Sequence, residues 1–264
     1  AEYLQGDEFD LSFDFYLAYN FIQPLIDGNL APLNQQIELS YASVPANQFA
    51  TFLSNHDQDR VMSQLGGNPQ MAMAAASLML TAPGVPFLYY GEEIGMLGQK
   101  PDEQIRSPMQ WSNSPFAGFS TVAPWQPLQT NWASSNVASE TNDPASILSH
   151  YRDLILIRSQ HAALRVGDLS VLNSGNDALY TILRVSQQEA VLVVVVNLSG
   201  SPVSDYALSV AQSRLAERSY TAYPILGEGD FAPLTTTAGS GFSQYIPLPE
   251  IPPYATIIIQ LNDP

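Results

Sequence analysis

Two short apolar runs, each ending in polar residues, flank a helical stretch in the first hundred residues. Residues 49–53 run directly into Asn55, His56 and Asp57, and residues 85–90 run into Glu92 and Glu93. Continuous apolar runs of this length are typical of parallel strands that are covered on both faces. Since α/β enzymes carry their chemistry at the carboxyl ends of parallel strands, the pattern predicts a βαβ unit with a site at these polar clusters.

The stretch between the two runs predicts a buried helix. Asn68 is a suitable N-cap and Pro69 a suitable first helical residue. Apolar residues such as Met71 and Leu78 then occupy nearly all sides of the helix, which Pro83-Gly84 ends.

Similar patterns flank this unit. Residues 10–15 alternate like a short strand, and residues 16–30 have a helical stripe that Pro24 interrupts. Asp10 and Asp14 could form an acid–base pair, but a cap or a solvated strand is the preferred interpretation. A further helix is predicted to begin after a cap at Asp143-Pro144 and to end near residue 161. His150 and His161, on that helix, are read as structural.

The segment 97–142 is rich in Gly, Pro, Ser and Asn and shows no periodicity. Loops of this length are usually functional or disordered. Its aromatic residues either form a wall of a substrate groove or pin the loop to the rest of the fold, and the sequence leaves both open; they are Trp111, Phe116, Phe119, Trp125 and Trp132.

The pattern of apolar and polar residues changes after residue 165. Short β-favouring runs at 178–185, 190–197, 220–225 and 255–261 are separated by Asn, Gly, Ser and Pro. This spacing predicts an antiparallel β-sandwich with 191–196 as a central strand. The chain therefore divides into an α/β part, residues 1–165, and an all-β part, residues 166–264.

The composition of the chain makes some classes of binding partner and some kinds of site unsuitable. The 264 residues carry 25 acidic and 9 basic side chains, a formal charge of -16, so nucleic acid and anionic membrane surfaces are poor partners. The chain has no cysteine, which excludes disulfides and thiolate zinc sites. It also has no apolar run of roughly 18 residues that could span a membrane.

Four motifs, in order, resemble the α-amylase superfamily, glycoside hydrolase family 13. Residues 52–57, FLSNHD, resemble its fourth signature region, and residues 83–96, PGVPFLYYGEEIGM, resemble the eighth barrel strand and the following loop. Residues 106–111, RSPMQW, and 117–119, AGF, resemble segments that follow in bacterial α-amylases and α-glucosidases. The resemblance implies the C-terminal portion of a (β/α)8 TIM barrel, strands 6 to 8, followed by the small β-sandwich domain.

In this family a nucleophilic aspartate follows the fourth strand and an acid/base glutamate follows the fifth, and no segment of this sequence resembles either. Residues 1–6 resemble the stretch beyond that glutamate. The expectation is therefore that the chain is the carboxyl part of a longer enzyme and is inactive alone. Its partners would be an α-glucan and either the missing barrel portion or a second copy.

By the resemblance, Asp57 is the third catalytic carboxylate, which stabilises the transition state by binding sugar hydroxyls. The candidate substrate-binding residues are Asn55, His56, Arg60, Lys100, Asp102 and Arg106. Asn55 is expected to shape the strand end, and Arg60 to pair with Asp57 or Asp59. The alternative interpretation of residues 55–57 is a capped strand end with a structural histidine.

The expectations about the type of enzyme, its cofactors and its location are less specific. Lys100-Pro101-Asp102 resembles endo-acting α-amylases more than α-glucosidases. An α-glucosidase or transglycosylase of the family, or a non-catalytic glucan-binding piece, remain alternatives. No cofactor is expected in this chain, although calcium is possible in the complete enzyme. A secreted or periplasmic location is preferred to a cytoplasmic one.

Overall fold

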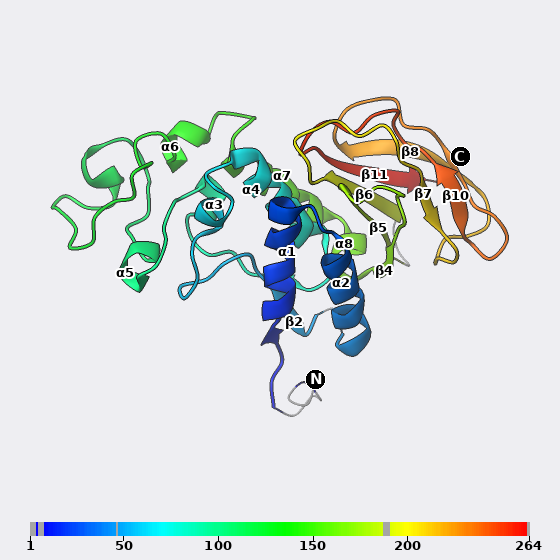
Figure 1. The fold of residues 1–264 in the computed structure, drawn as a ribbon, viewed down its shortest axis with the longest axis horizontal. Coiled ribbons are helices and arrows are strands. Elements are labelled where there is room, and N and C mark those ends of the chain that lie inside the picture. Colours follow the sequence, from blue (N-terminus) through cyan, green and yellow to red (C-terminus); the bar gives the residue numbers. More distant parts are fainter. Residues whose placement is uncertain (1–3, 5–7, 46, 187–190, 263–264) are drawn as a thin grey trace.

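The fold has two parts, a group of helices around a short parallel sheet and a larger antiparallel sheet (Figure 1). The computed structural model describes residues 4, 8–45, 47–186 and 191–262. No helix in these ranges is long and apolar enough to cross a membrane.

The parallel sheet contains the predicted βαβ unit. Its strands lie in the order β1 (Ser12–Phe13), β2 (Phe49–Thr51) and β3 (Val85–Pro86), and both pairings are parallel. Ala50 pairs with Phe13 on one side and with Val85 on the other. The predicted second strand is shorter than residues 85–90, because the backbone leaves the ladder after Phe87 N–H donates to the carbonyl of Thr51.

Helix α4 (Pro69–Thr81) connects β2 to β3 as the sequence predicts. The side chain of Asn68 accepts hydrogen bonds from the backbone N–H groups of Gln70 and Met71. Nine residues of the helix are buried, from Ala72 to Thr81, because α1, α7 and the antiparallel sheet all pack around it. The short helix α3 (Val61–Gln64) precedes it.

Replacing Asn68 by alanine should lower the free energy of unfolding by about 1 kcal/mol, because two N–H groups at the start of α4 lose their acceptor. Urea unfolding followed by circular dichroism measures the loss. Asn68→Ser, which retains an acceptor, should recover most of it. An Asn68→Ala protein as stable as the parent would contradict this role for the cap.

Residues 16–30 contain one helix, which ends at Asp27, and the N-cap of a second, Leu30. Helix α1 (Phe15–Asp27) begins at Asp14, whose carboxylate accepts from the N–H of Leu17, so the preferred interpretation of Asp14 as a cap is confirmed. Gly28 ends α1 in the left-handed conformation with φ of 73°. The sequence analysis did not predict helix α2 (Ala31–Ser43), whose buried positions are few and whose apolar stripe is correspondingly weak.

The long segment that follows β3 holds only short helical turns. They are the 3-10 turns η2 (Glu92–Ile94) and η3 (Pro115–Gly118) and the helices α5 (Asp102–Ile105) and α6 (Val137–Glu140). Helix α7 (Ile147–Gln160) then begins with Ser146 as its N-cap, not Asp143, which instead closes a turn by accepting from Ala145 N–H. Helix α8 (Ala162–Val166) leads into the antiparallel sheet.

The antiparallel part consists of a six-stranded sheet and a two-stranded sheet. The order in the large sheet is β4-β5-β6-β11-β8-β9, so β6 is internal as predicted, and β7 pairs with β10. Four strands match the predicted runs and four were missed, because the missed strands are at most four residues long. The bounds are β4 (Asp168–Val171), β5 (Leu179–Val185), β6 (Val191–Asn197), β7 (Leu208–Val210), β8 (Ser219–Leu226), β9 (Leu234–Thr235), β10 (Phe242–Tyr245) and β11 (Thr256–Asn262).

The large sheet is buried on both faces. Side chains such as Val194 and Ile258 join the core formed by the helices. Side chains of the opposite face, such as Val193 and Ile259, share a second core with residues of β7 and β10. Thr256 Oγ1 also donates to Ser77 Oγ of α4 at 2.6 Å, so the sheet is hydrogen-bonded to the helix that positions the site.

Candidate active site

Asp57 lies in the turn that follows β2, at the carboxyl end of the parallel sheet. Its backbone N–H donates to Asn55 Oδ1 at 2.8 Å, so Asn55 shapes this turn. The side chains of Asp57 and His56 are 61% and 66% exposed, and His56 Nε2 lies 3.5 Å from Asp57 Oδ2. The Asp57 carboxylate is therefore open to solvent and beside a nitrogen that can donate to a shared ligand.

Arg106 holds this turn in place from a distant segment. Its Nη2 donates to Asp57 Oδ1 at 2.9 Å and to Asp102 Oδ2 at 2.8 Å. Its Nε donates to the backbone carbonyl of His56 at 2.9 Å. One guanidinium thus fixes both the backbone of the turn and the carboxylate that faces solvent.

The segment 100–106 is itself tied to the same turn. Lys100 Nζ lies 2.9 Å from Asp102 Oδ1, and Lys100 N–H donates to Asp59 Oδ1 at 2.7 Å. The hydrogen bond from Lys100, with the positive charge of Arg106, lowers the pKa of Asp102. Asp102 therefore stays ionised and keeps Arg106 oriented toward Asp57.

Arg60 does not make the ion pair that the sequence analysis predicts. Among the described residues it makes no ion pair with Asp57 or Asp59, because its side chain turns inward and is only 1% exposed. Its Nη1 donates to the carbonyl of Tyr90 at 2.6 Å, and its guanidinium carbon lies 4.8 and 4.6 Å from the ring centres of Tyr89 and Tyr90. Arg60 supports the loop after β3 and does not face the solvent side where a substrate would approach.

Glu92 lies behind the turn. It is 5% exposed, and Ser54 Oγ donates to its Oε2 at 3.4 Å. Burial, followed by the charge of neighbouring Glu93, raises the pKa of Glu92 well above its ordinary value. Glu93 accepts from the N–H of Gly91 at 2.7 Å. Both glutamates therefore contact nearby structural groups.

Replacing Glu92 by glutamine should flatten part of the dependence of stability on pH. The folded protein retains a proton on Glu92 that the unfolded chain releases above its ordinary pKa, so stability falls as pH rises from there toward the folded pKa. The slope from one group approaches about 1.4 kcal/mol per pH unit. Urea unfolding at several pH values measures it, with Glu38→Gln, at an exposed position of α2, as the control; equal slopes in the parent and Glu92→Gln would contradict the assignment.

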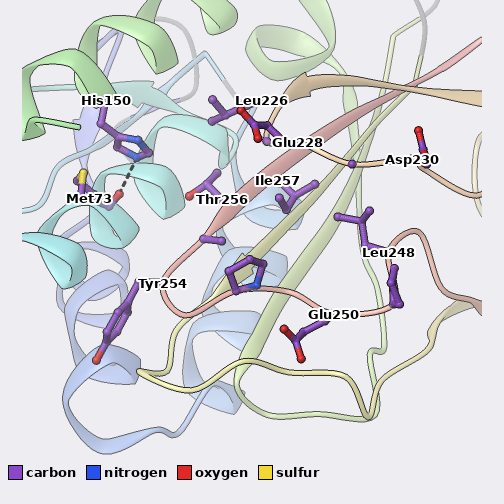
Figure 2. Close-up of a pocket in the computed structure, with 15 residues that line it drawn as sticks. Met73, His150, Leu226, Glu228, Asp230, Leu248, Glu250, Tyr254, Thr256 and Ile257 are labelled. Carbon is purple, nitrogen blue, oxygen red and sulfur yellow. Dashed lines mark hydrogen bonds between the residues drawn. The ribbon is translucent and has the colours of Figure 1, made fainter. Parts of the chain in front are cut away.

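His150 lies in a different part of the molecule. Its Nε2 is 2.8 Å from Ser77 Oγ and 3.1 Å from the carbonyl of Met73, and burial lowers its pKa. It lines a cavity of about 730 Å³ between the helices and the antiparallel sheet (Figure 2). None of the candidate site residues lines this cavity, and the structural interpretation of His150 agrees with these contacts.

The geometry brings together five of the residues that the sequence singled out, His56, Asp57, Lys100, Asp102 and Arg106. The pairing of Arg106 with Asp57 was not predicted, because 49 residues separate them and no local pattern links them. Within the described ranges, no three His, Cys, Asp or Glu side chains are grouped so that they could hold a metal ion.

The comparisons with known proteins place this chain in a family of glycoside hydrolases. The sequence model of the α-amylase catalytic domain matches residues 1–167, so the chain belongs to this family. Alpha-amylase 3 of Dictyoglomus thermophilum is 38% identical over 147 residues, 55% of this chain and 29% of that protein. The oligo-1,6-glucosidase of Parageobacillus thermoglucosidasius is 29% identical over 189 residues, 56% of this chain and 34% of that protein.

The solved structures extend the likeness to nearly the whole chain. The crystal structure of the α-amylase from H. orenii matches with a TM-score of 0.74 and 31% identity, covering 97% of this chain and 49% of that one. The structural neighbours are TIM-barrel enzymes of the α-amylase family. The chain spans about a third or less of the length of the two curated relatives and about half of this solved structure.

Proposed function

We propose that this chain is part of a retaining α-amylase-type glycoside hydrolase that acts on α-1,4-glucans, and that it supplies the third carboxylate of the site. Retaining cleavage needs one carboxylate to attack the anomeric carbon and one carboxylic acid to protonate the leaving oxygen. Both would come from segments outside the printed sequence. Without them this chain would bind sugar but not cleave it.

The position of Asp57 carries the proposal. Its carboxylate is solvent-exposed at the end of a parallel strand. Arg106 binds only Oδ1, so Oδ2, which lies 3.5 Å from the exposed His56 imidazole, can still accept from a sugar hydroxyl. Such hydrogen bonds strengthen as the ring distorts toward the transition state, which is how a non-reacting group accelerates the chemistry. His56 would donate to the same hydroxyls.

We further propose that residues 1–165 belong to a (β/α)8 barrel, strands 6 to 8, and residues 166–264 to a β-sandwich domain. Three parallel strands leave an incomplete barrel wall. Phe13, Phe15 and Phe87 beside these strands are 48%, 57% and 42% exposed. The partner would be the remaining barrel portion or a second copy, since apolar surface of this kind is normally covered. Analytical ultracentrifugation showing a compact lone monomer would reject both partners.

The test of the function is cleavage by the complete protein. Long amylose cut to mid-sized fragments, with retention of the anomeric configuration by NMR, is the expected result for an endo-acting α-amylase. The resemblance of residues 100–102 favours this outcome. Release of glucose from short maltooligosaccharides would favour the second candidate, an α-glucosidase or transglycosylase. Absence of both cleavage and maltooligosaccharide binding would reject the proposal, whereas binding without cleavage would indicate a glucan-binding protein.

A further inference from the structure

The cavity between the helices and the antiparallel sheet has the size and character of a ligand site. Its volume of about 730 Å³ falls within the range of about 300–1,000 Å³ that is typical of sites for small molecules. Its walls are mainly apolar and include Met73 of α4, Leu226 of β8 and Ile257 of β11. None of the candidate residues around Asp57 lines it, so a ligand here would be separate from the proposed sugar substrate.

The charged side chains at this cavity are acidic. Glu228, Asp230 and Glu250 line it, and among the described residues no lysine or arginine does so. None of the three carboxylates forms an ion pair within the described ranges. Figure 2 shows Asp230 and Glu250 on loops of the antiparallel part, whereas Met73 and His150 come from the helices. Carboxylates without a counter-charge beside an apolar wall favour a cationic ligand and disfavour an anionic one.

His150 adds an unused hydrogen-bond acceptor on the helical side of the cavity. Its Nε2 lies 3.1 Å from the carbonyl of Met73, which can only accept, so Nε2 carries the proton. Burial lowers the pKa of His150, so the ring is neutral near pH 7 and its other nitrogen, Nδ1, has a free lone pair. In the part of the chain that the structure describes, no donor is hydrogen-bonded to Nδ1. An N–H group of a ligand would supply that donor.

Hydrogen bonds between the two parts of the fold hold the cavity walls in place. Thr256 Oγ1 donates to Ser77 Oγ at 2.6 Å, and Ser77 Oγ donates to the carbonyl of Met73 at 3.0 Å. Tyr254, which also lines the cavity, has φ of 54°, and its N–H donates to the carbonyl of Ser199 at 3.1 Å. Non-glycine residues with positive φ persist where the surroundings fix them, often at ligand sites. The cavity is therefore preformed, which reduces the ordering that binding requires.

We propose that this cavity binds a small organic cation, an ammonium group on an apolar body. The apolar body would lie against the walls, and the charge would lie beside the carboxylates of Glu228, Asp230 and Glu250. The formal charge of -16 adds a general attraction for such a ligand. A neutral sugar would leave the three carboxylates unpaired. The site is independent of the proposed function, since it shares no residue with the surroundings of Asp57.

The experiment uses the full chain and three indole ligands that differ in charge. Tryptamine is cationic, tryptophol is neutral and indole-3-propionate is anionic. Titration calorimetry gives each affinity at about 0.15 M salt, where charges more than about 8 Å apart are largely screened. The variants are Glu228→Gln, Asp230→Asn and Glu250→Gln, singly and together. Asp205→Asn is the matched control, since Asp205 is an exposed carboxylate of the antiparallel part that does not line the cavity.

Tryptamine is expected to bind most tightly, tryptophol more weakly and indole-3-propionate least. Each single variant should lose about threefold in affinity for tryptamine and the triple variant more than tenfold, with no loss in Asp205→Asn. Equal affinities for the three ligands would show that the carboxylates do not select the ligand and would overturn the proposal. Equal tryptamine binding by the parent and the triple variant, or no tryptamine binding by the parent, would overturn it as well.

NMR of the histidine rings locates the ligand from the helical side. The chain has three histidines, His56, His150 and His161, so their ring signals can be assigned from single replacements. Tryptamine should shift the Nδ1 signal of His150 and leave the signals of His56 and His161 unchanged. Shifts confined to His56 or His161 would mean that tryptamine binds elsewhere, and the cavity would then not be its site.

Discussion

Replacing Arg158 by alanine is expected to lower the free energy of unfolding by roughly 3 kcal/mol or more, since each of three backbone carbonyls left without a donor costs about 1–3 kcal/mol. Arg158 is 7% exposed on α7, and its Nη1 donates to the carbonyls of Leu80 and Ala82 at 2.8 and 3.0 Å. Its Nη2 donates to the carbonyl of Gly84 at 2.5 Å. These carbonyls lie at the end of α4 and in the turn into β3. Loss of the hydrogen bonds from Arg158 would leave these buried acceptors without partners.

The size of this effect depends on burial, which also lowers the pKa of Arg158 to about 9. Urea unfolding of Arg158→Ala and Arg152→Ala measures it. Arg152 is an exposed arginine on the same helix, and its replacement should change stability by less than about 0.5 kcal/mol. Equal effects of the two substitutions would show that the three carbonyls do not depend on Arg158.

The sequence predicts the helix–strand pattern well where a local signal exists. The strand at 49–51 and helix α4 follow from an uninterrupted apolar run, an Asn68-Pro69 start and a Pro83-Gly84 end. Helix α2 was missed because Leu33, Ile37 and Ser40 are its only buried positions, so it has hardly any apolar stripe. Arg158 lies in the last turn of α7 but donates to carbonyls at the end of α4 and before β3, which no local pattern indicates.

In the candidate site too, features with a local sequence signal were predicted, and features that depend on distant residues were not. The placement of Asp57 and the shaping role of Asn55 depend on the strand end and its turn, which are local. The direction of the Arg60 side chain depends on Tyr89 and Tyr90, about thirty residues away. Arg106 reaches Asp57 across 49 residues. The sequence analysis expected Arg60 to pair with Asp57 or Asp59, since burial beside two tyrosine rings cannot be inferred from neighbouring residues.

Replacing Asp57 by asparagine is expected to lower kcat of the complete enzyme by about 100-fold to 1000-fold, with a much smaller change in KM. Asparagine has nearly the same shape but no charge, so it cannot stabilise the positive charge that builds on the anomeric carbon. The salt bridge with Arg106 would be lost as well.

Kinetics with maltoheptaose measure the effect, and Asp102→Asn separates the two contributions. Asp102 contacts Arg106 and Lys100 but not Asp57, so it acts on Asp57 through the Arg106 guanidinium. If Asp57 stabilises the transition state directly, Asp102→Asn should cost no more than about tenfold, because Arg106 keeps its bonds to Asp57 and to the His56 carbonyl. Equal losses in both variants would mean that Asp57 acts only as an anchor for Arg106, and the carboxylate would then have no direct part in cleavage.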